Sequence, residues 1–435
     1  MTTNLRTMAV RARMAATLTT RRASLRLLAV SGDPVAACLA LRPDDDVYAI
    51  YERIRARGPV VTSRVGVHAV TSRALCDEVL RDSRFRVQDQ DGRPLGYKEM
   101  TADAGGPLQG SFLELDPPDH ARLRRLVAPT FRPRLIRAYA DRAEAVAHRL
   151  LDRSADRDTF DLVADFASPF PITVISDLLG IPGVDSAQFA RFGVLVGQSL
   201  DGVRSLREAD ALREASDELA ALFTRLALER RVNPAGDVIS VLAAAQADGG
   251  MTASELVSTC GLLLHAGFET TVNLIGNGVA ALLADRTAWD RLVADPSLAP
   301  RAVEETLRYD PSVQATARMA HEDVELGGRT LPAGSIVLPI LAAANRDPQV
   351  YRDPARFDLS REGEPEHLSF SSGIHYCLGA PLARLEGEIA FRVLAQRLPE
   401  LHAAGGARRR RGGTIRGYST FPVTSAPTRA PALDR

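Results

Sequence analysis

The sequence predicts a mainly helical fold with small β-sheets, built as one continuous domain. Its 435 residues are rich in alanine and aliphatic side chains, and only 5% are aromatic, which favours helices over an all-β structure. Helical patterns dominate residues 119–310, whereas short-strand patterns occupy residues 60–70 and 324–341. Because no internal repeat and no Pro/Ser-rich linker divides the chain, we expect a single domain with a large core.

Charge and cysteine content argue against several classes of protein. The 54 Lys and Arg residues balance 54 Asp and Glu residues, so no global field favours a nucleic-acid partner. The four cysteines form no CxxC pair, which argues against a disulfide scaffold or a zinc module and suits a reducing cytosol. No apolar run reaches the roughly 18 residues that a spanning helix needs. We therefore expect a soluble cytoplasmic protein.

Residues 1–43 are predicted to be a basic N-terminal extension that is only partly ordered. Arginine stands at positions 6, 11, 13, 21, 22 and 26, and no acidic residue precedes Asp33. The segment lacks the apolar core and the small-residue cleavage site of a secretory signal. We expect an extension without an address function, and association with an anionic membrane surface is the alternative.

Several further elements follow from local patterns. We expect a first helix over residues 44–57 and a small β-hairpin over 60–70. Residues 86–111 have little periodicity and are predicted to form a long loop, which in compact domains is often a lid or a binding loop. The basic run at 408–411 is expected to be a solvated loop, and residues 426–435 are expected to be disordered.

A long core helix carries two unfavourable residues at its centre. Thr252 and Glu255 have the spacing of a capping box, and residues 256–283 are apolar or small on nearly every side. Gly267 costs about 1 kcal/mol relative to alanine in a helix. A buried carboxylate at Glu269 costs several kcal/mol unless it is paired or protonated. The two together indicate a local opening of the helix for a small ligand and water, and a kink with a solvated acid is the alternative.

The segment Phe370–Gly379 places one thiol, Cys377, at the start of a predicted helix. Free backbone N–H groups and the helix dipole there are expected to lower the pKa of the thiol and to favour the metal-binding thiolate. Gly373 permits a tight bend, and Gly379 leaves room for a flat group close to the backbone. This pattern suits a thiolate presented to a planar metal cofactor.

Two other roles for Cys377 compete with metal binding. A lone cysteine is usually an inert core residue, which is our expectation for Cys38, Cys76 and Cys260. A cysteine near a histidine, here His375, can also be a hydrolase nucleophile.

Residues 370–379 resemble the haem-ligand loop of the cytochrome P-450 family, in which a Phe, two glycines, a His or Arg and the Cys stand at these spacings. One departure is Ser371, where the family usually has glycine. The resemblance spans residues 44–425 in the family's order. It implies a triangular-prism, single-domain haem-thiolate monooxygenase fold with haem b bound by Cys377.

The resemblance also assigns roles to other residues. It makes Glu269 and Thr270 the acid–alcohol pair that delivers protons for oxygen activation. It places Glu305, Arg308 and Arg356 in a structural triad beneath the haem. The cofactor-binding positions that it implies are His120, Arg124, Ala266, Gly267, Arg318, Phe370, Gly373, His375 and Gly379. Of these, His120, Arg124, Arg318 and His375 are expected to contact the haem propionates.

The implied function is a monooxygenase that inserts one atom of O2 into a small apolar organic substrate. Its electrons would come from NAD(P)H through a separate ferredoxin reductase and ferredoxin. The expected docking charges are Arg122, Arg125 and Arg384, although ordinary solvated charges explain them equally well. A haem-thiolate peroxygenase or isomerase and a non-catalytic haem-binding sensor are the alternatives.

The expected substrate pocket is assigned by resemblance in position only. It draws on residues 86–111, Leu262, Val313–Gln314 and Thr420–Phe421. His265 is either a core histidine bonded to a backbone carbonyl or a pocket residue that orients substrate.

Overall fold

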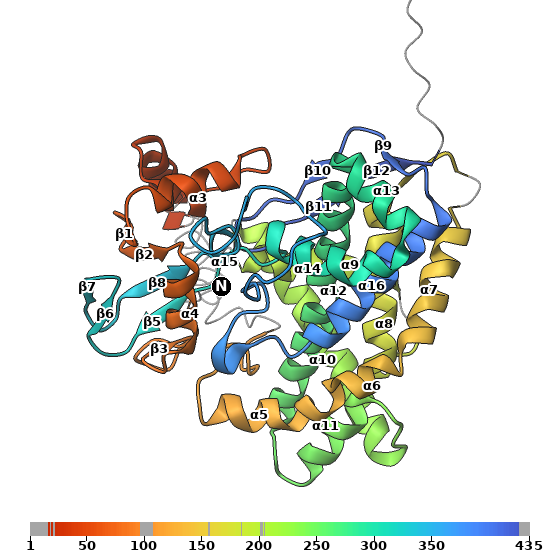
Figure 1. Ribbon diagram of the computed structural model, residues 1–435. Coiled ribbons are helices and arrows are strands. Elements are labelled where there is room, and N and C mark those ends of the chain that lie inside the picture. Colours follow the sequence, from red (N-terminus) through yellow and green to blue (C-terminus); the bar gives the residue numbers. More distant parts are fainter. Residues whose placement is uncertain are drawn as a thin grey trace, which may run out of the picture.

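A computed structural model describes residues 22–95, 108–154, 157–183, 185–200, 203 and 205–425, together with 16–17 and 19–20. The fold is mainly helical with small sheets, as predicted (Figure 1). The helices are α2 (Pro34–Leu39), α3 (Val47–Arg55), α4 (Arg73–Arg81), α5 (Asp119–Val127), α6 (Pro133–Arg137), α7 (Ala140–Asp152), α8 (Pro169–Leu179), α9 (Ser186–Ser199), α10 (Leu206–Val232), α11 (Val238–Ala247), α12 (Ala253–Ala284), α13 (Arg286–Ala294), α14 (Ala299–Tyr309), α15 (Leu341–Ala344) and α16 (Ala380–Arg397).

Within the part of the chain that the structure describes, the strands form four small sheets. They are β1 (Val60–Thr62), β2 (Val67–Val70), β3 (Phe85–Arg86), β4 (Thr159–Asp161), β5 (Arg318–Ala320), β6 (Val324–Leu326), β7 (Arg329–Leu331), β8 (Ile336–Pro339), β9 (His402–Ala403), β10 (Arg408–Arg409), β11 (Tyr418–Thr420) and β12 (Pro422–Thr424). The largest described sheet has the order β1-β2-β8-β5-β3, so the predicted hairpin at 60–70 pairs with a strand far along the chain. This sheet lies with α3 and α4 beside the helical part of the molecule (Figure 1).

Helix α12 passes through the middle of the helical part (Figure 1). It begins at the predicted capping box, in which Thr252 and Glu255 each accept a hydrogen bond from the other's backbone N–H. The expected local opening is absent, because the helix is continuous through Gly267. A Cβ atom on Gly267 would lie 2.6 Å from Cγ1 of Ile175, so the glycine lets α8 pack closely. Within the described residues, no helix is both long enough and apolar enough to cross a membrane.

The N-terminal part of the described chain is packed against α3. Asp33 caps α2 by accepting hydrogen bonds from the N–H groups of Val35 and Ala36. Val35 and Cys38 are buried in one apolar cluster with Tyr51 of α3. Residues 34–39 therefore belong to the packed structure, although the sequence placed them in the extension. Residues 1–15 and the predicted disordered tail at 426–435 lie outside the described residues.

A buried ion network joins α14 to the segment that follows α15. Glu305 pairs with Arg308 at 2.7 Å and with Arg361 at 3.0 Å. The prediction that Arg356 completes this triad is wrong, because its side chain is exposed and only its backbone carbonyl takes part, accepting from Arg308 and Arg361. The chain turns between the two arginines, so that Arg361 points back at the carboxylate. Arg308 also donates to the carbonyl of Pro354 at 2.8 Å and so ties this segment to α14.

Candidate functional site

The Cys377 loop is held in a defined bend before α16. The Cys377 N–H donates to the Phe370 carbonyl at 2.8 Å. Gly373 has a positive φ of 66°, and a Cβ atom there would lie 2.5 Å from the Leu80 carbonyl oxygen. Ser371 also has a positive φ, 64°, in a region that glycine adopts at no steric cost. The loop therefore requires glycine at 373 and tolerates strain at the position where the resemblance expects glycine.

The half-buried Cys377 thiol does not have the lowered pKa that the sequence predicted. Burial raises its pKa, and this effect outweighs the opposing hydrogen bonds from the N–H groups of Gly379 and Ala380 and the charge of Arg124. The predicted helix N-terminus is present, and its N–H groups act to lower the pKa of the thiol. The loss of solvation on burial raises that pKa by more. A metal ion reverses this balance, because a coordinating thiol loses its proton outright.

The four basic side chains that the sequence assigns to the haem propionates gather near this loop. The rings of His120 and His375 lie 4.5 Å apart, and the Nε2 atom of each is buried without a hydrogen-bond partner among the described residues. Arg318 is 4% exposed, and Arg124 donates to the Tyr376 carbonyl at 2.5 Å. Burial, with the charges of Arg318, His120 and Arg124, lowers the pKa of His375 to about 3.

The arrangement of these four groups indicates a site for negative charge. None of them forms an ion pair with a described carboxylate, and a buried guanidinium such as that of Arg318 is costly without one. The carboxylate whose charge acts on Arg318 is that of Asp116. Its oxygens accept hydrogen bonds from the N–H groups of Val87 and Gln88 and form no ion pair with Arg318. Two carboxylates on a planar macrocycle would satisfy the donors. The residues therefore fit the haem that the sequence implies.

One face of α12 is accessible to solvent near the centre of the helix. Ala266 is exposed and Thr270, one turn later, is half-buried, whereas most of the helix is buried. The Thr270 hydroxyl donates to the Ala266 carbonyl at 3.1 Å, and the Thr270 carbonyl accepts from the Ser312 hydroxyl at 2.6 Å. A ligand on this face would meet a small side chain and a hydroxyl.

Glu269 points away from this open face and is 2% exposed. It forms an ion pair with Arg410, which is 12% exposed. Burial raises the pKa of Glu269, while the charge of Arg410 acts to lower it. The prediction that residues 408–411 form a solvated loop is therefore wrong for Arg410, and also for Arg409, which donates to Asn277 on α12. Arg410 is 141 residues from Glu269, so no local signal could have identified this partner.

His265 lies on the side of α12 that faces α9 and α10. It lines a small apolar cavity with Phe192, Val196 and Leu219. It is 8% exposed, and its Nδ1 atom has no partner among the described residues, so the expected bond to a backbone carbonyl is not seen. Burial and the charge of Arg410 lower the pKa of His265 to about 3, which keeps the imidazole neutral.

The expected docking arginines differ in their surroundings. Arg122 pairs with Asp119 and Glu255, and Arg384 pairs with Glu304, so both are engaged within the chain. Arg125 is exposed.

The expected pocket residues also differ in their surroundings. Leu262 is buried, and Gln314 is committed to the core, where its side chain accepts from the Tyr51 hydroxyl at 3.0 Å. Thr420 and Phe421 hydrogen-bond to Asp161. Residues 96–107 of the predicted loop lie outside the described residues.

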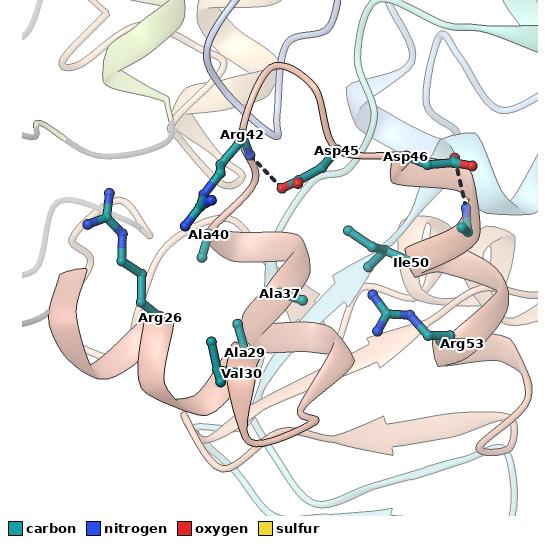
Figure 2. Close-up of a pocket in the computed structure, with 11 residues that line it drawn as sticks. Arg26, Ala29, Val30, Ala37, Ala40, Arg42, Asp45, Asp46, Ile50 and Arg53 are labelled. Atoms are coloured by element: carbon teal, nitrogen blue, oxygen red, sulfur yellow. Dashed lines mark hydrogen bonds between the residues drawn. The ribbon is translucent and has the colours of Figure 1, made fainter.

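A separate surface pocket of about 400 Å³ lies between residues 26–30, α2 and α3 (Figure 2). Its apolar lining includes Ala37 and Ile50, and three arginines stand around it: Arg26, Arg42 and Arg53. None of the predicted site residues lines this pocket.

The chain is similar to known proteins of one family. The family described as Cytochrome P-450 matches residues 207–398. The putative cytochrome P-450 140 of Mycobacterium tuberculosis is 40% identical over 400 residues, which are 88% of this chain and 90% of that protein. The 6-deoxyerythronolide B hydroxylase of Saccharopolyspora erythraea is 38% identical over 394 residues, covering 87% and 96%. The crystal structure of P450BioI with an acyl carrier protein ligated to hexadec-9Z-enoic acid has a TM-score of 0.81 at 35% identity, covering 87% and 98%.

Proposed function

The chain belongs to the cytochrome P-450 family, and on that premise we propose that it is a monooxygenase that inserts one atom of O2 into an apolar organic substrate. The observation that carries the proposal is the set of unpaired basic groups, His120, Arg124, Arg318 and His375, gathered near the Cys377 loop. The catalytic domain would span residues 34–425, because α2 packs against α3 and so extends the predicted boundary at residue 44 toward the N-terminus. Hydroxylation or epoxidation is the expected reaction.

The family implies haem, and we assign haem b as the form that this chain binds. Cys377 would be the iron ligand. The side chains of His120, Arg124, Arg318 and His375 would bind the propionate carboxylates of the haem. When bound, the haem supplies the activation of O2. Phe370 would support the thiolate side, where its ring is stacked beneath the Arg384 guanidinium, 4.6 Å away. Ala266, which is small and exposed, would leave the surface of α12 low on the opposite side.

The chain's own residues would supply the protons. Cleavage of O2 needs two protons, and Thr270 presents a hydroxyl on the open face of α12. Glu269, next to it, is buried but ionisable, and a raised pKa lets it take up and release a proton closer to neutral pH. The Thr270 hydroxyl would orient the group that donates the proton. Glu269 would then pass protons from solvent to that group to replace those consumed.

Electrons would arrive from NAD(P)H through a separate ferredoxin reductase and ferredoxin. Arg125 is the exposed member of the three predicted docking arginines and so the one free to meet an acidic partner. The substrate would be a small apolar organic molecule of the lipid, terpenoid, steroid or polyketide type. The names of the relatives support this class, since one is a 6-deoxyerythronolide B hydroxylase and one structure holds an acyl chain.

The thiolate assignment has a direct spectroscopic test. Reduced protein with carbon monoxide should show the red-shifted Soret band of a haem-thiolate, and Cys377→Ser should abolish that band. Cys260→Ser, which alters a fully buried thiol on α12, is the matched control and should keep it. A band that survives Cys377→Ser would contradict the assignment.

Turnover separates monooxygenase activity from its alternatives. With O2, NAD(P)H, a ferredoxin reductase and a ferredoxin, the wild-type protein should convert substrate with consumption of NAD(P)H. Conversion with peroxide alone would indicate a peroxygenase, and an absence of turnover under both conditions would indicate a sensor.

A further inference from the structure

Four polar residues form a buried stripe along one face of α12. His265, Glu269, Asn273 and Asn277 follow one another at intervals of four residues, so their side chains lie in a row. Their exposed fractions are 8%, 2%, 0% and 1%. A row of buried polar groups in a core helix costs free energy unless each group has a partner.

The C-terminal segment that contains β10 and β11 covers most of this stripe. Arg409 donates to the Asn277 side-chain oxygen at 2.9 Å, and Arg410 pairs with Glu269. Gly417 lies so close to Asn273 that no side chain fits between them. Three side chains of the stripe are therefore in contact with one short segment.

Arg410 is itself fixed by this segment. Its Nε donates to the Tyr418 carbonyl at 3.0 Å, and its backbone N–H donates to the Gly417 carbonyl at 3.0 Å. The carbonyl groups of Tyr418, in β11, and of Gly417, just before it, thus fix the orientation of the Arg410 guanidinium. It meets the Glu269 carboxylate from that fixed position.

Helix α9 closes the other side of Glu269 with two glycines. A Cβ atom on Gly193 would lie 2.8 Å from Oε2 of Glu269, and one on Gly197 would lie 3.5 Å from Oε1. The Glu269 carboxylate therefore lies between the two glycines of α9 on one side and the Arg410 guanidinium on the other. The described charged or titratable groups that face it are Arg410, from the C-terminal segment, and His265, from its own helix.

Two atoms beside Glu269 on the stripe lack partners. Nδ1 of His265, one turn before it, and Oδ1 of Asn273, one turn after it, are both buried without a hydrogen bond among the described residues. Orphaned buried polar atoms of this kind are usually satisfied by ordered water. The cavity beside His265 is about the size of one water molecule.

We propose that Arg410 is a positioning residue that holds the Glu269 carboxylate in place and favours its charged form, so that the C-terminal segment 408–421 forms part of the proton-delivery apparatus. The inference rests on the relay role proposed above for Glu269. The positive guanidinium stabilises the charged form of Glu269 and so opposes the effect of burial.

The first test measures Glu269 itself and does not depend on turnover. Infrared difference spectra between pH values report the carboxyl band of Glu269, identified by its loss in Glu269→Gln. Arg410→Gln should move the titration midpoint of this band upward by about 1–3 pH units, because an opposite charge at contact distance shifts a carboxyl by that amount. Arg410→Lys should keep most of the wild-type midpoint.

The matched control is Arg408→Gln, which removes an exposed guanidinium two residues away on the same segment. It should leave the midpoint unchanged. Circular dichroism and thermal unfolding of each holoenzyme variant verify that the fold is kept. Equal midpoints for Arg410→Gln and Arg408→Gln would overturn the positioning role.

The second test measures coupling, the amount of product formed per NAD(P)H consumed, as a function of pH. Arg410→Gln should lower coupling and shift its pH profile in the same direction as the infrared midpoint. If the midpoint shifts while Glu269→Gln leaves coupling unchanged, Arg410 still positions Glu269, and the relay function proposed for Glu269 fails. If Glu269→Gln uncouples the enzyme and Arg410→Gln changes neither quantity, the relay stands and our inference is wrong.

Discussion

Arg308 and Glu305 form a buried two-bond ion pair in which Nε and Nη2 of the guanidinium each donate to one carboxylate oxygen at 2.7 Å. Each side chain is 4% exposed. Arg361 adds a third bond to the same carboxylate at 3.0 Å. The Glu305 carboxylate therefore pairs with two guanidinium groups. Removing it leaves Arg308 without a carboxylate partner among the described residues, whereas Arg361 keeps its pair with Glu364.

Glu305→Gln should destabilise the protein by about 3–5 kcal/mol, because it breaks a buried pair and leaves charge behind. Arg361→Ala should cost about 1.5–3 kcal/mol, the range for a hydrogen bond to a charged group. Arg356→Ala should stay within about 0.5 kcal/mol, since that side chain is exposed. Urea unfolding of the three variants gives the comparison. A larger loss of stability for Arg356→Ala than for Arg361→Ala would show that Arg356, as the sequence predicted, is the third member of the triad.

Gly267→Ala should lower stability even though alanine is the better helix former by about 1 kcal/mol. The new Cβ atom would lie 2.6 Å from Ile175, and overpacking of a core typically costs about 1–3 kcal/mol. Gly276→Ala is the control on the same helix, where the added atom would make an ordinary 3.6 Å contact with Tyr418. It should be neutral or stabilising.

A double-mutant cycle separates packing from any effect on a bound cofactor. Ile175→Ala makes room for the new methyl group, so the two substitutions together should cost less than the sum of their separate effects, with a coupling of about 0.5–3 kcal/mol. Strict additivity in thermal or chemical unfolding would show that Gly267 is not retained for its contact with α8.

The extent of the packed domain is tested by deletion. Removing residues 1–31 leaves α2 and its cap Asp33 intact and should change the free energy of unfolding little. Removing residues 1–43 takes away Val35, which is fully buried, and should cost about 3 kcal/mol or more, given about 1.5–3 kcal/mol for each buried apolar side chain. Equal stabilities for the two truncated proteins would place the boundary at residue 44, where the sequence indicated it.

Sequence patterns identified features that depend on neighbouring residues. The capping box at Thr252 and the bend at Gly373 are local signals, and the structure has both. Features set by the path of the chain were missed. Arg361 replaces Arg356 because of a turn between them, and Arg410 reaches Glu269 from far along the sequence. Gly267 was misread because a glycine that opens a helix and one that admits a neighbouring helix look alike in sequence.

Acid should weaken the contact between α14 and the segment before the Cys377 loop. Burial acts to raise the pKa of Glu304, but the contacts with His367 and Arg384 lower it to about 2, below its usual 4.5. A carboxyl with a lowered folded-state pKa contributes stability that is complete above the unfolded-state pKa and is lost as the pH falls toward the folded-state value. The loss should therefore occur between about pH 4.5 and pH 2.

The measurement is the unfolding midpoint of wild type and Glu304→Gln from pH 7 down to pH 3. Glu304→Gln should be less stable than wild type at pH 7, and the difference should narrow steadily below pH 4.5, because protonation removes the charge from the wild-type side chain as well. The side chain is 45% exposed, so solvent screening keeps the effect modest. A difference that stays constant across this range, or that widens with acid, would contradict the assignment of a lowered pKa to Glu304.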